Sequence, residues 1–418
     1  MRFSTLFVGY SCVLGLLVGI MSAVFLSFTN LMIDVVWTTI PETLSIPFYP
    51  ILVGLIGGCL VGLIQTKIGR YPTTMHETLS EFKQKKRVTY KKQIGKNFLS
   101  AIIVLMFGAS LGPEAALAGI MGGLITWMGD RLKLTLQRKE ELLELGIGTM
   151  LAAIFRAPLA GVSEVFEQNN PPTGNDKVKK TILYALSTGF GLLGFLLTKR
   201  LFPEESIFSL HFPKNISWKW QAIVFSPVSW LIGGLFGGLF GVLFLELEKL
   251  TDRLAAKIDN LVISALIAGL CIGIFALWSP YFLFSGEQQL LPLSKQALQL
   301  SFINLLLLGI GKAFLTNLCF SFGWRGGKIF PAIFSSTAIG FAVVRLIPYT
   351  PGLIVGVAVA ASTTIILRQP YVCAALLLFL FPIQFFPFIL ISCLGMKRFE
   401  EYLRAKRKSS NLTFSPRL

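Results

Sequence analysis

Long apolar segments follow one another along almost the whole chain, and they restrict its fold more than any other feature. Hydrophobic residues make up 54% of the 418 residues and charged residues only 14%, whereas a soluble domain is typically about a quarter charged. The apolar segments are 5–37, 47–68, 98–128, 142–166, 181–201, 221–247, 260–285, 299–322, 326–347, 351–367 and 371–395. Because one crossing needs roughly 20 apolar residues, we predict an all-α polytopic membrane protein with about ten crossings.

The chain is also strongly basic, with 38 Lys and Arg against 21 Asp and Glu and a net charge of +17. Much of the excess lies in the loop 83–96 and the tail 397–418, as the positive-inside rule predicts for cytoplasmic segments. We therefore expect a multi-pass protein of the cell membrane with both segments in the cytoplasm. The basic excess is then explained by orientation in the lipid bilayer, and we expect no nucleic-acid partner.

Residues that support metal or imidazole chemistry are scarce. The chain has six cysteines without CxxC spacing and only two histidines, His76 and His211. We expect no metal, no cofactor and no enzymatic activity. An intramembrane enzyme is the alternative from another class, but it requires a nucleophile beside a base, which these two histidines are poorly placed to provide.

Two parts of the chain repeat one pattern of interrupted helices. A Gly/Pro-broken segment at 112–115 precedes an Arg-x-Pro at 156–158, and a second at 327–331 precedes an Arg-x-Pro at 368–370. Corresponding broken helices in two halves indicate a binding site near the bilayer midplane, where helix N-termini attract anions. We predict two inverted-topology repeats with broken and re-entrant helices. The expected units are 1–200, 201–396 and a short basic tail, 397–418.

Glu114 is the most unusual charge in the sequence, because no other charged residue lies between Asn97 and Trp127. An acid within a membrane segment indicates a functional role. Directly after Gly112-Pro113 it is expected in the first turn of a helix, where the dipole stabilises its carboxylate. There it would compete with a bound anion until protonation released it. The structural alternative is an acid that only satisfies backbone donors.

Other ionisable residues lie beside the broken segments. We interpret Arg156 and Arg368 as structural clamps on carbonyls or buried acids. Lys312, Arg325 and Lys328 bring positive charge to the second broken segment, and Lys328 either favours anions near a pore or is a paired or snorkelling lysine.

Two acids at the end of the 142–166 segment have a similar ambiguity. Glu164 and Glu167 lie one turn apart on one helical face, next to Gln168. They could form an aqueous proton route or an intracellular vestibule, or they could be ordinary interfacial acids.

These motifs together resemble the CLC family of chloride channels and proton-coupled anion antiporters. Residues 111–116 resemble the family segment with the external gating glutamate, which implies that role for Glu114 beside Gly112 and Pro113. Residues 155–161 resemble its F-N-A-P-L-A-G stretch, and 326–331 its G-G-x-F-x-P segment. The latter implies that Lys328, Ile329 and Phe330 supply backbone amides to the central anion. Arg368-Gln369-Pro370 and Cys393-Leu394-Gly395 match its last segments.

The chain also departs from the family pattern. Its first anion-binding motif, G-S-G-I-P, is replaced near 69–76, where Thr73, Thr74 or Met75 stands in for the usual serine. A methionine there is similar to the fluoride-exporting branch. Gln168 occupies the position of the internal proton-relay glutamate, so Glu164 or Glu167 substitutes for it or the protein is a channel. The pore tyrosine has no clear counterpart in Tyr402, and the CBS regulatory domains of many relatives are not expected.

The resemblance implies transport of a small monovalent anion, above all chloride, by a glutamate-gated channel or an anion/proton antiporter. It also implies a homodimer with one pathway per subunit and protons as a second transported ion. A fluoride/proton antiporter of the same fold is the nearest alternative.

Overall fold

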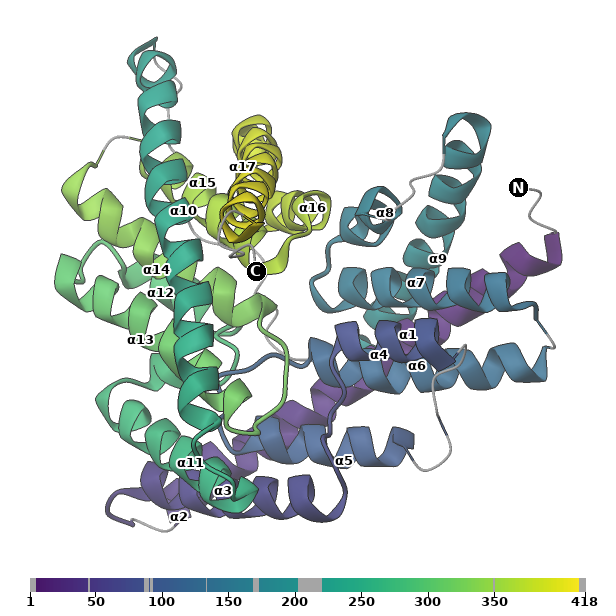
Figure 1. The fold of residues 1–418 in the computed structure, drawn as a ribbon, viewed down its shortest axis with the longest axis horizontal. Coiled ribbons are helices and arrows are strands. Elements are labelled where there is room, and N and C mark those ends of the chain that lie inside the picture. Colours follow the sequence, from purple (N-terminus) through teal and green to yellow (C-terminus); the bar gives the residue numbers. More distant parts are fainter. Residues whose placement is uncertain are drawn as a thin grey trace, which may run out of the picture.

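Every regular element of the computed structural model is a helix throughout the part of the chain that it describes (Figure 1). The described residues are 5–43, 46–85, 90, 93–132, 134–167, 173–201, 220–348 and 350–412. The first helices are α1 (Thr5–Asp34), the π-helix η1 (Val35–Thr39), α2 (Ile40–Thr43), α3 (Tyr49–Lys67), α4 (Met75–Lys85), α5 (Gln93–Met106), α6 (Glu114–Arg131), α7 (Leu136–Ile154), α8 (Pro158–Glu167) and α9 (Gly174–Leu201). They are followed by α10 (Trp220–Ala255), α11 (Leu261–Trp278), η2 (Pro280–Phe282), α12 (Leu290–Gln296), α13 (Phe302–Ser321), α14 (Ile329–Leu346), α15 (Pro351–Leu367), α16 (Pro370–Leu380), η3 (Ile383–Phe385) and α17 (Phe386–Leu412).

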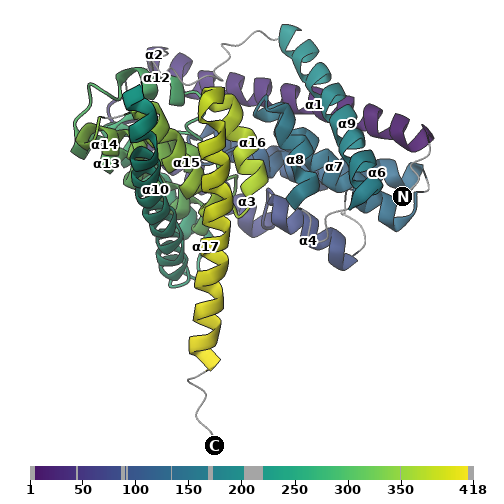
Figure 2. The same ribbon diagram turned by 90° about the horizontal axis from the view of Figure 1, so that it is seen from above.

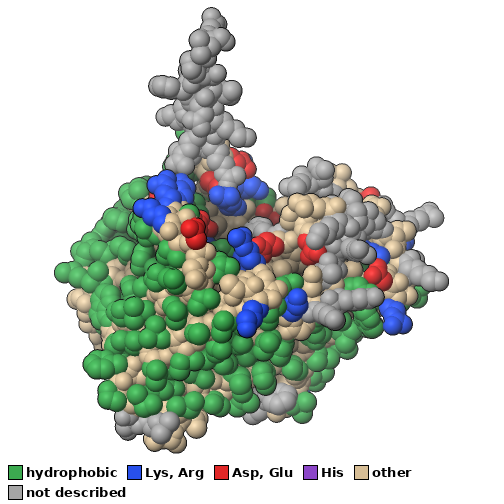
Figure 3. Space-filling model, turned by 60° about the horizontal axis from the view of Figure 1, so that its bottom comes forward, with side chains coloured by type: hydrophobic (Ala, Val, Ile, Leu, Met, Phe, Trp, Pro, Cys, Tyr) green, Lys and Arg blue, Asp and Glu red, His purple; other side chains and the backbone are tan. Residues whose placement is uncertain are grey.

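Seven helices of the described chain are long and apolar enough to cross a membrane. They are Thr5–Thr43, Tyr49–Lys67, Gly174–Leu201, Val224–Ala255, Leu261–Trp278, Phe302–Ser321 and Ile329–Leu346. The space-filling view has a broad apolar surface, whereas the Lys, Arg, Asp and Glu side chains gather at one end of it (Figure 3). This distribution is the one expected of a protein whose flanks contact lipid, as the apolar sequence predicts.

The remaining apolar segments form shorter helices because Gly and Pro interrupt them. The 98–128 segment divides into α5 and α6 around residues 107–113, and the 142–166 segment divides into α7 and α8 at Phe155–Ala157. Both breaks have residues in the left-handed region, Gly108 with φ 83° and Arg156 with φ 48°. Their equivalents in the second half are Gly323 with φ 93° and Arg368 with φ 63°.

The second half repeats the helices of the first half in the same order. Helices α6 and α14 both have 18 residues, α7 and α15 have 19 and 17, α8 and α16 have 10 and 11, and α9 and α17 have 28 and 27. Equivalent residues also meet, because Gly112 and Gly327 form an isolated antiparallel bridge. An antiparallel contact between equivalent residues is the geometry that an approximate two-fold axis produces.

The long helices pack in pairs, α1 with α9, α3 with α11 and α10 with α15 (Figures 1 and 2). Helix α17 then projects beyond the rest of the molecule (Figure 2). The α3–α11 pair approaches closely, because a Cβ atom on Gly54 would overlap the Gly269 carbonyl oxygen and one on Gly269 would overlap that of Gly54. Small residues allow such backbone contact between membrane helices.

We expect Gly269→Ala to destabilise the protein, because the new methyl group must separate α3 from α11. Overpacking of this kind costs about 1–3 kcal/mol, which should lower the detergent melting temperature measured by fluorescence-detected gel filtration. Gly189→Ala in α9 is the matched control, since a Cβ there meets nothing within 4 Å. It should leave the melting temperature unchanged or raise it. Equal behaviour of the two variants would contradict the close approach.

Candidate functional site

The N-termini of α6 and α14 meet at the bridge between the two halves. Gly112 N donates to Gly327 O and Gly327 N donates to Gly112 O, both at 2.8 Å. Two residues later α6 begins at Glu114 and α14 begins at Ile329, and neither preceding residue caps its helix with a side chain. The bridge therefore brings two helix N-termini, with their unpaired amides and positive dipole ends, to one place.

The Glu114 carboxylate lies on the N-terminus of α14 rather than in solvent. Its Oε1 accepts a hydrogen bond of 2.8 Å from Ile329 N. Its Oε2 is buried and has no hydrogen-bond partner among the described residues, and the whole residue is only 5% exposed. A Cβ on either Gly112 or Gly327 would overlap this carboxyl group. The two glycines thus leave beside the backbone the space that the carboxylate fills.

Two hollows adjoin this point. The larger, of about 460 Å³, is lined by Thr74, Met75, Glu114, Ala115, Leu245, Glu248, Phe320, Gly326–Ile329 and Ile366–Gln369. The smaller, of about 130 Å³, is lined by Leu26, Thr29, Asn30, Ile33, Leu105, Leu111, Pro113 and Phe284–Gln289. Residues that follow α3 line the first hollow, and the last turns of α1 line the second. Residues 111–114 therefore separate the two hollows.

Thr74 and Met75 share the larger cavity with Glu114, whereas Thr73 is engaged elsewhere. Thr73 N and Oγ1 both donate to Asn97 Oδ1, at 2.7 and 3.1 Å. Thr74 Oγ1 accepts from Glu77 N, and Thr74 N donates to Glu77 Oε2, so the pair forms a capping box at the start of α4. Of the three residues predicted for this segment, the structure brings two to the cavity.

The three residues from the second motif have different surroundings. Ile329 supplies the amide that contacts Glu114. The Lys328 ammonium group donates to Glu248 Oε1 at 2.7 Å, so this lysine is paired. The Phe330 ring stacks on Phe155, with ring centroids 4.2 Å apart, and joins the two interrupted segments through an apolar contact.

The other cations predicted beside the breaks also have partners. Lys312 is fully buried, and its Nζ donates to the carbonyl oxygens of residues 281–284 at 2.7–3.0 Å, so it stabilises the end of η2 and lies outside both hollows. Arg325 donates to Pro72 O at 3.1 Å and pairs with Glu77. Arg368 pairs with Glu400 at 3.1 Å. The Arg156 guanidinium lies 5.7 Å from the Phe195 ring centroid.

The predicted acids of α8 have two different environments. Glu167 Oε1 accepts from Tyr371 N at 2.6 Å and from Val372 N at 3.3 Å, so it caps the N-terminus of α16 from the other half of the chain. Glu164 is 9% exposed, and its buried Oε2 has no hydrogen-bond partner within the described residues. The carboxyl groups of Glu167 and Glu144 are near enough to repel a charge on Glu164. Gln168 lies outside the described residues.

Glu248 is a charged residue that lines the cavity but that the sequence does not identify as a site residue. It follows the apolar segment 221–247 on α10 and there has the pattern of an ordinary interfacial acid. Only the tertiary fold brings it to Lys328, 80 positions away. Across the described residues, no group of three His, Cys, Asp or Glu side chains is placed to hold a metal ion.

A protein-family model described as voltage gated chloride channel matches residues 57–399. A search of curated proteins finds no match. Among solved structures, a slow cyanobacterial Cl⁻/H⁺ antiporter is similar with a TM-score of 0.76 and 20% identity over 96% of each chain. A CLC-type fluoride/proton antiporter has a TM-score of 0.71 and 18% identity over 95% of this chain and 96% of that one. A eukaryotic CLC transporter has a TM-score of 0.67 and 17% identity over 96% of this chain and 73% of that one.

These similarities confirm the predicted all-helical, multi-span fold. The cyanobacterial antiporter and the fluoride/proton antiporter match at similar scores, so the fold fits either transported anion.

Glu77, the partner of Arg325, should make the thermal stability of the protein depend on pH. Partial burial raises the pKa of Glu77, but hydrogen bonds from Arg325 and Thr74 outweigh it and leave the pKa below its ordinary value. A depressed pKa contributes stability above the unfolded-state value, and that contribution is lost as the pH falls through the folded-state value. We expect Glu77→Gln to lower the melting temperature by on the order of 1–2 °C above about pH 5 and by less as the pH falls below about 4.

Thermal unfolding in detergent at several pH values measures this effect. Glu42→Gln, an exposed acid of α2, is the control and should change nothing. A Glu77→Gln effect of the same size at every pH would show that the ion pair is not its cause.

Proposed function

The chain belongs to the voltage-gated chloride channel (CLC) family, and on that premise we propose that it carries chloride through a pathway gated by Glu114. Anion transport by a multi-pass membrane protein, rather than catalysis, is the activity of this family. Beyond family membership, the proposal specifies chloride as the main substrate, Glu114 as the gate and a route for protons. The observation that carries it is the position of the Glu114 carboxylate on the amides of α14.

A carboxylate at a helix N-terminus occupies the place that a small anion would take. Backbone amides and the helix dipole stabilise either one, so the two compete for the site. Fixed dipoles bind an anion without the strong attraction of a full charge, which favours its release. Gly112, Pro113, Lys328, Ile329 and Phe330 contribute backbone to this region, and Thr74 and Met75 line the route to it. Thr73 supports the route through Asn97.

The positions of the two hollows support a gate at residues 111–114. Glu114 lines the larger cavity, and its neighbours Leu111 and Pro113 line the smaller one. Movement of one side chain would therefore connect or separate them. With the basic loop 83–96 and the tail in the cytoplasm, the larger cavity is the cytoplasmic entrance. We also propose a homodimer, with one such pathway in each subunit.

Protons require a second route, because the position expected for the relay glutamate is Gln168. We assign this role to Glu164, whose buried carboxyl group has an oxygen without a partner in the described structure. Glu167 is engaged by the amides of α16, so it serves the route by positioning α8 against α16.

A fluoride/proton antiporter of the same fold is the second candidate. Met75 lines the cavity that contains Glu114, at the place where the family's serine motif is absent. Chloride is the first choice because residues 326–329 of the G-G-x-F-x-P-like segment line the cavity.

Efflux from liposomes that contain the purified protein decides between these candidates. Vesicles loaded with potassium chloride or potassium fluoride are treated with a potassium ionophore, with or without a protonophore, and the released anion is measured with a selective electrode. Chloride release supports the proposal, and release of fluoride alone would overturn the chloride assignment. A requirement for the protonophore identifies an exchanger, and release without it identifies a channel.

We expect Glu114→Gln to abolish the coupling of protons to anion flux and to remove its pH dependence. A neutral amide competes less well than a carboxylate for the α14 amides, by about 1 kcal/mol, which raises anion occupancy about fivefold. The same liposome assay at several pH values, with a pH-sensitive dye to follow protons, measures both effects.

Gly327→Ala provides a second variant, because the added Cβ displaces the Glu114 carboxyl group without removing it. It should also raise anion flux. Glu401→Gln, an exposed acid of α17, is the control. Full pH dependence in the Glu114→Gln protein would refute its role as the gate.

A further inference from the structure

Lys328 and Glu248 form an ion pair inside the proposed cytoplasmic entrance. Lys328 precedes the first residue of α14, and Glu248 reaches it from α10, with 2.7 Å between Nζ and Oε1. Both side chains line the same cavity as Glu114, and they are 15% and 34% exposed. An anion that enters this cavity therefore meets the pair in the same space as Glu114.

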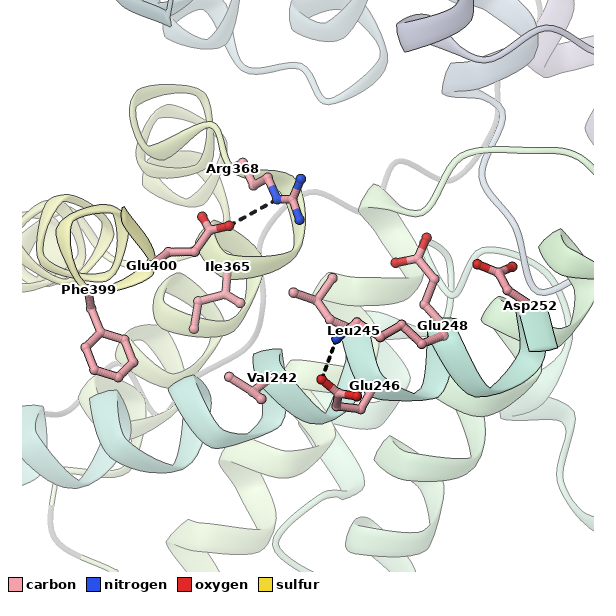
Figure 4. Close-up of a pocket in the computed structure, with 10 residues that line it drawn as sticks. Val242, Leu245, Glu246, Glu248, Asp252, Ile365, Arg368, Phe399 and Glu400 are labelled. Carbon is pink, nitrogen blue, oxygen red and sulfur yellow. Dashed lines mark hydrogen bonds and ion pairs between the residues drawn. The ribbon is translucent and has the colours of Figure 1, made fainter. Parts of the chain in front are cut away.

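The charges that line this cavity cancel. Its ionisable residues are Glu114, Glu248, Lys328 and Arg368, two acids and two bases. A second hollow of about 390 Å³ adjoins the cavity, since Leu245, Glu248 and Arg368 line both. Figure 4 shows Glu248 on α10, and Arg368 at the end of α15 directed toward Glu400 of α17. Each base at the entrance thus has its own acid.

Lys328 would keep its position if Glu248 lost its charge. Its Nζ also donates to Asn317 Oδ1 at 3.2 Å and lies 4.2 Å from the Phe320 ring centroid. Asn317 is itself fixed, because its Nδ2 donates to Phe244 O and Ala313 O, both at 3.1 Å. The ammonium group is therefore held by three partners, of which only Glu248 neutralises it.

We propose that Glu248 determines how strongly the pathway attracts anions, by neutralising Lys328 at the cytoplasmic entrance. This inference rests on the proposed transport function. The lysine alone would concentrate anions near the α14 amides, since a charged cleft focuses the field on its ligand. With Glu248 in place, an entering anion must compete with a carboxylate for the same ammonium group. Glu248 thus lowers affinity and prevents the anion from being retained at the entrance.

The test is anion flux as a function of anion concentration in liposomes with Glu248→Gln, Lys328→Gln and the double variant. We expect Glu248→Gln to lower the apparent KM about three- to tenfold, because the Lys328 ammonium group is then no longer neutralised, and this effect should weaken at high ionic strength. Lys328→Gln should raise the apparent KM. When Glu248→Gln is added to Lys328→Gln, it should change the apparent KM by less than half as much as it does when added to the wild type.

Glu246→Gln is the matched control, because Glu246 lies on the same helix but pairs with Lys249 at 2.6 Å. It should leave the apparent KM unchanged. A purely structural ion pair predicts the opposite sign for Glu248→Gln, with lower flux and a lower melting temperature. That result, or equal behaviour of the Glu246 and Glu248 variants, would overturn the inference.

Anion binding to the detergent-solubilised protein, measured by titration calorimetry with chloride and with fluoride, separates this inference from the transport proposal. Tighter binding by Glu248→Gln supports the role of Glu248 even if the wild type shows no flux, which would overturn the transport proposal alone. Unchanged binding beside an active wild type would overturn only the role of Glu248.

Discussion

The arrangement of the whole protein depends on one short contact, the antiparallel bridge between Gly112 and Gly327. Two backbones approach closely there because neither residue has a side chain, and the space left is filled by the Glu114 carboxyl group. The bridge aligns the first turns of α6 and α14, so Glu114 of one half lies on the helix N-terminus of the other. A Cβ at either glycine would therefore meet the Glu114 carboxyl group first.

The few charges inside the apolar part of the chain follow a common physical rule. Helix ends leave amides and carbonyls without partners, and a bilayer offers no water to satisfy them. Glu114 and Glu167 satisfy amides at the starts of α14 and α16, and the Lys312 ammonium group satisfies four carbonyls at the end of η2. Acids therefore lie at helix N-termini and a base at a C-terminal end, as the helix dipole favours.

Local signals in the sequence predict where helices break, but not which distant residues their side chains contact. Gly and Pro before Glu114, and Arg-x-Pro after Phe155 and Leu367, locate the helix ends because they act on the adjacent backbone. The pairing of Lys328 with Glu248 joins residues 80 positions apart, and that of Glu167 with the amide of Tyr371 joins residues 204 apart. Such contacts depend on how the helices pack, and no local pattern encodes them. The isolation of Glu114 and the Gly-Pro before it predict an acid in the first turn of a helix, and the family resemblance adds the expected gating role.

The proposed entrance combines two kinds of attraction for an anion. The amides of α14 are fixed by the helix and cannot be neutralised without a competing carboxylate, which is Glu114. The Lys328 ammonium group is a full charge, and it is balanced by a separate acid, Glu248. A site made of dipoles alone binds weakly enough to release its ligand, whereas an unbalanced lysine beside it would retain the anion. The pairing of Lys328 therefore follows from the same requirement for rapid release that favours backbone coordination at the gate.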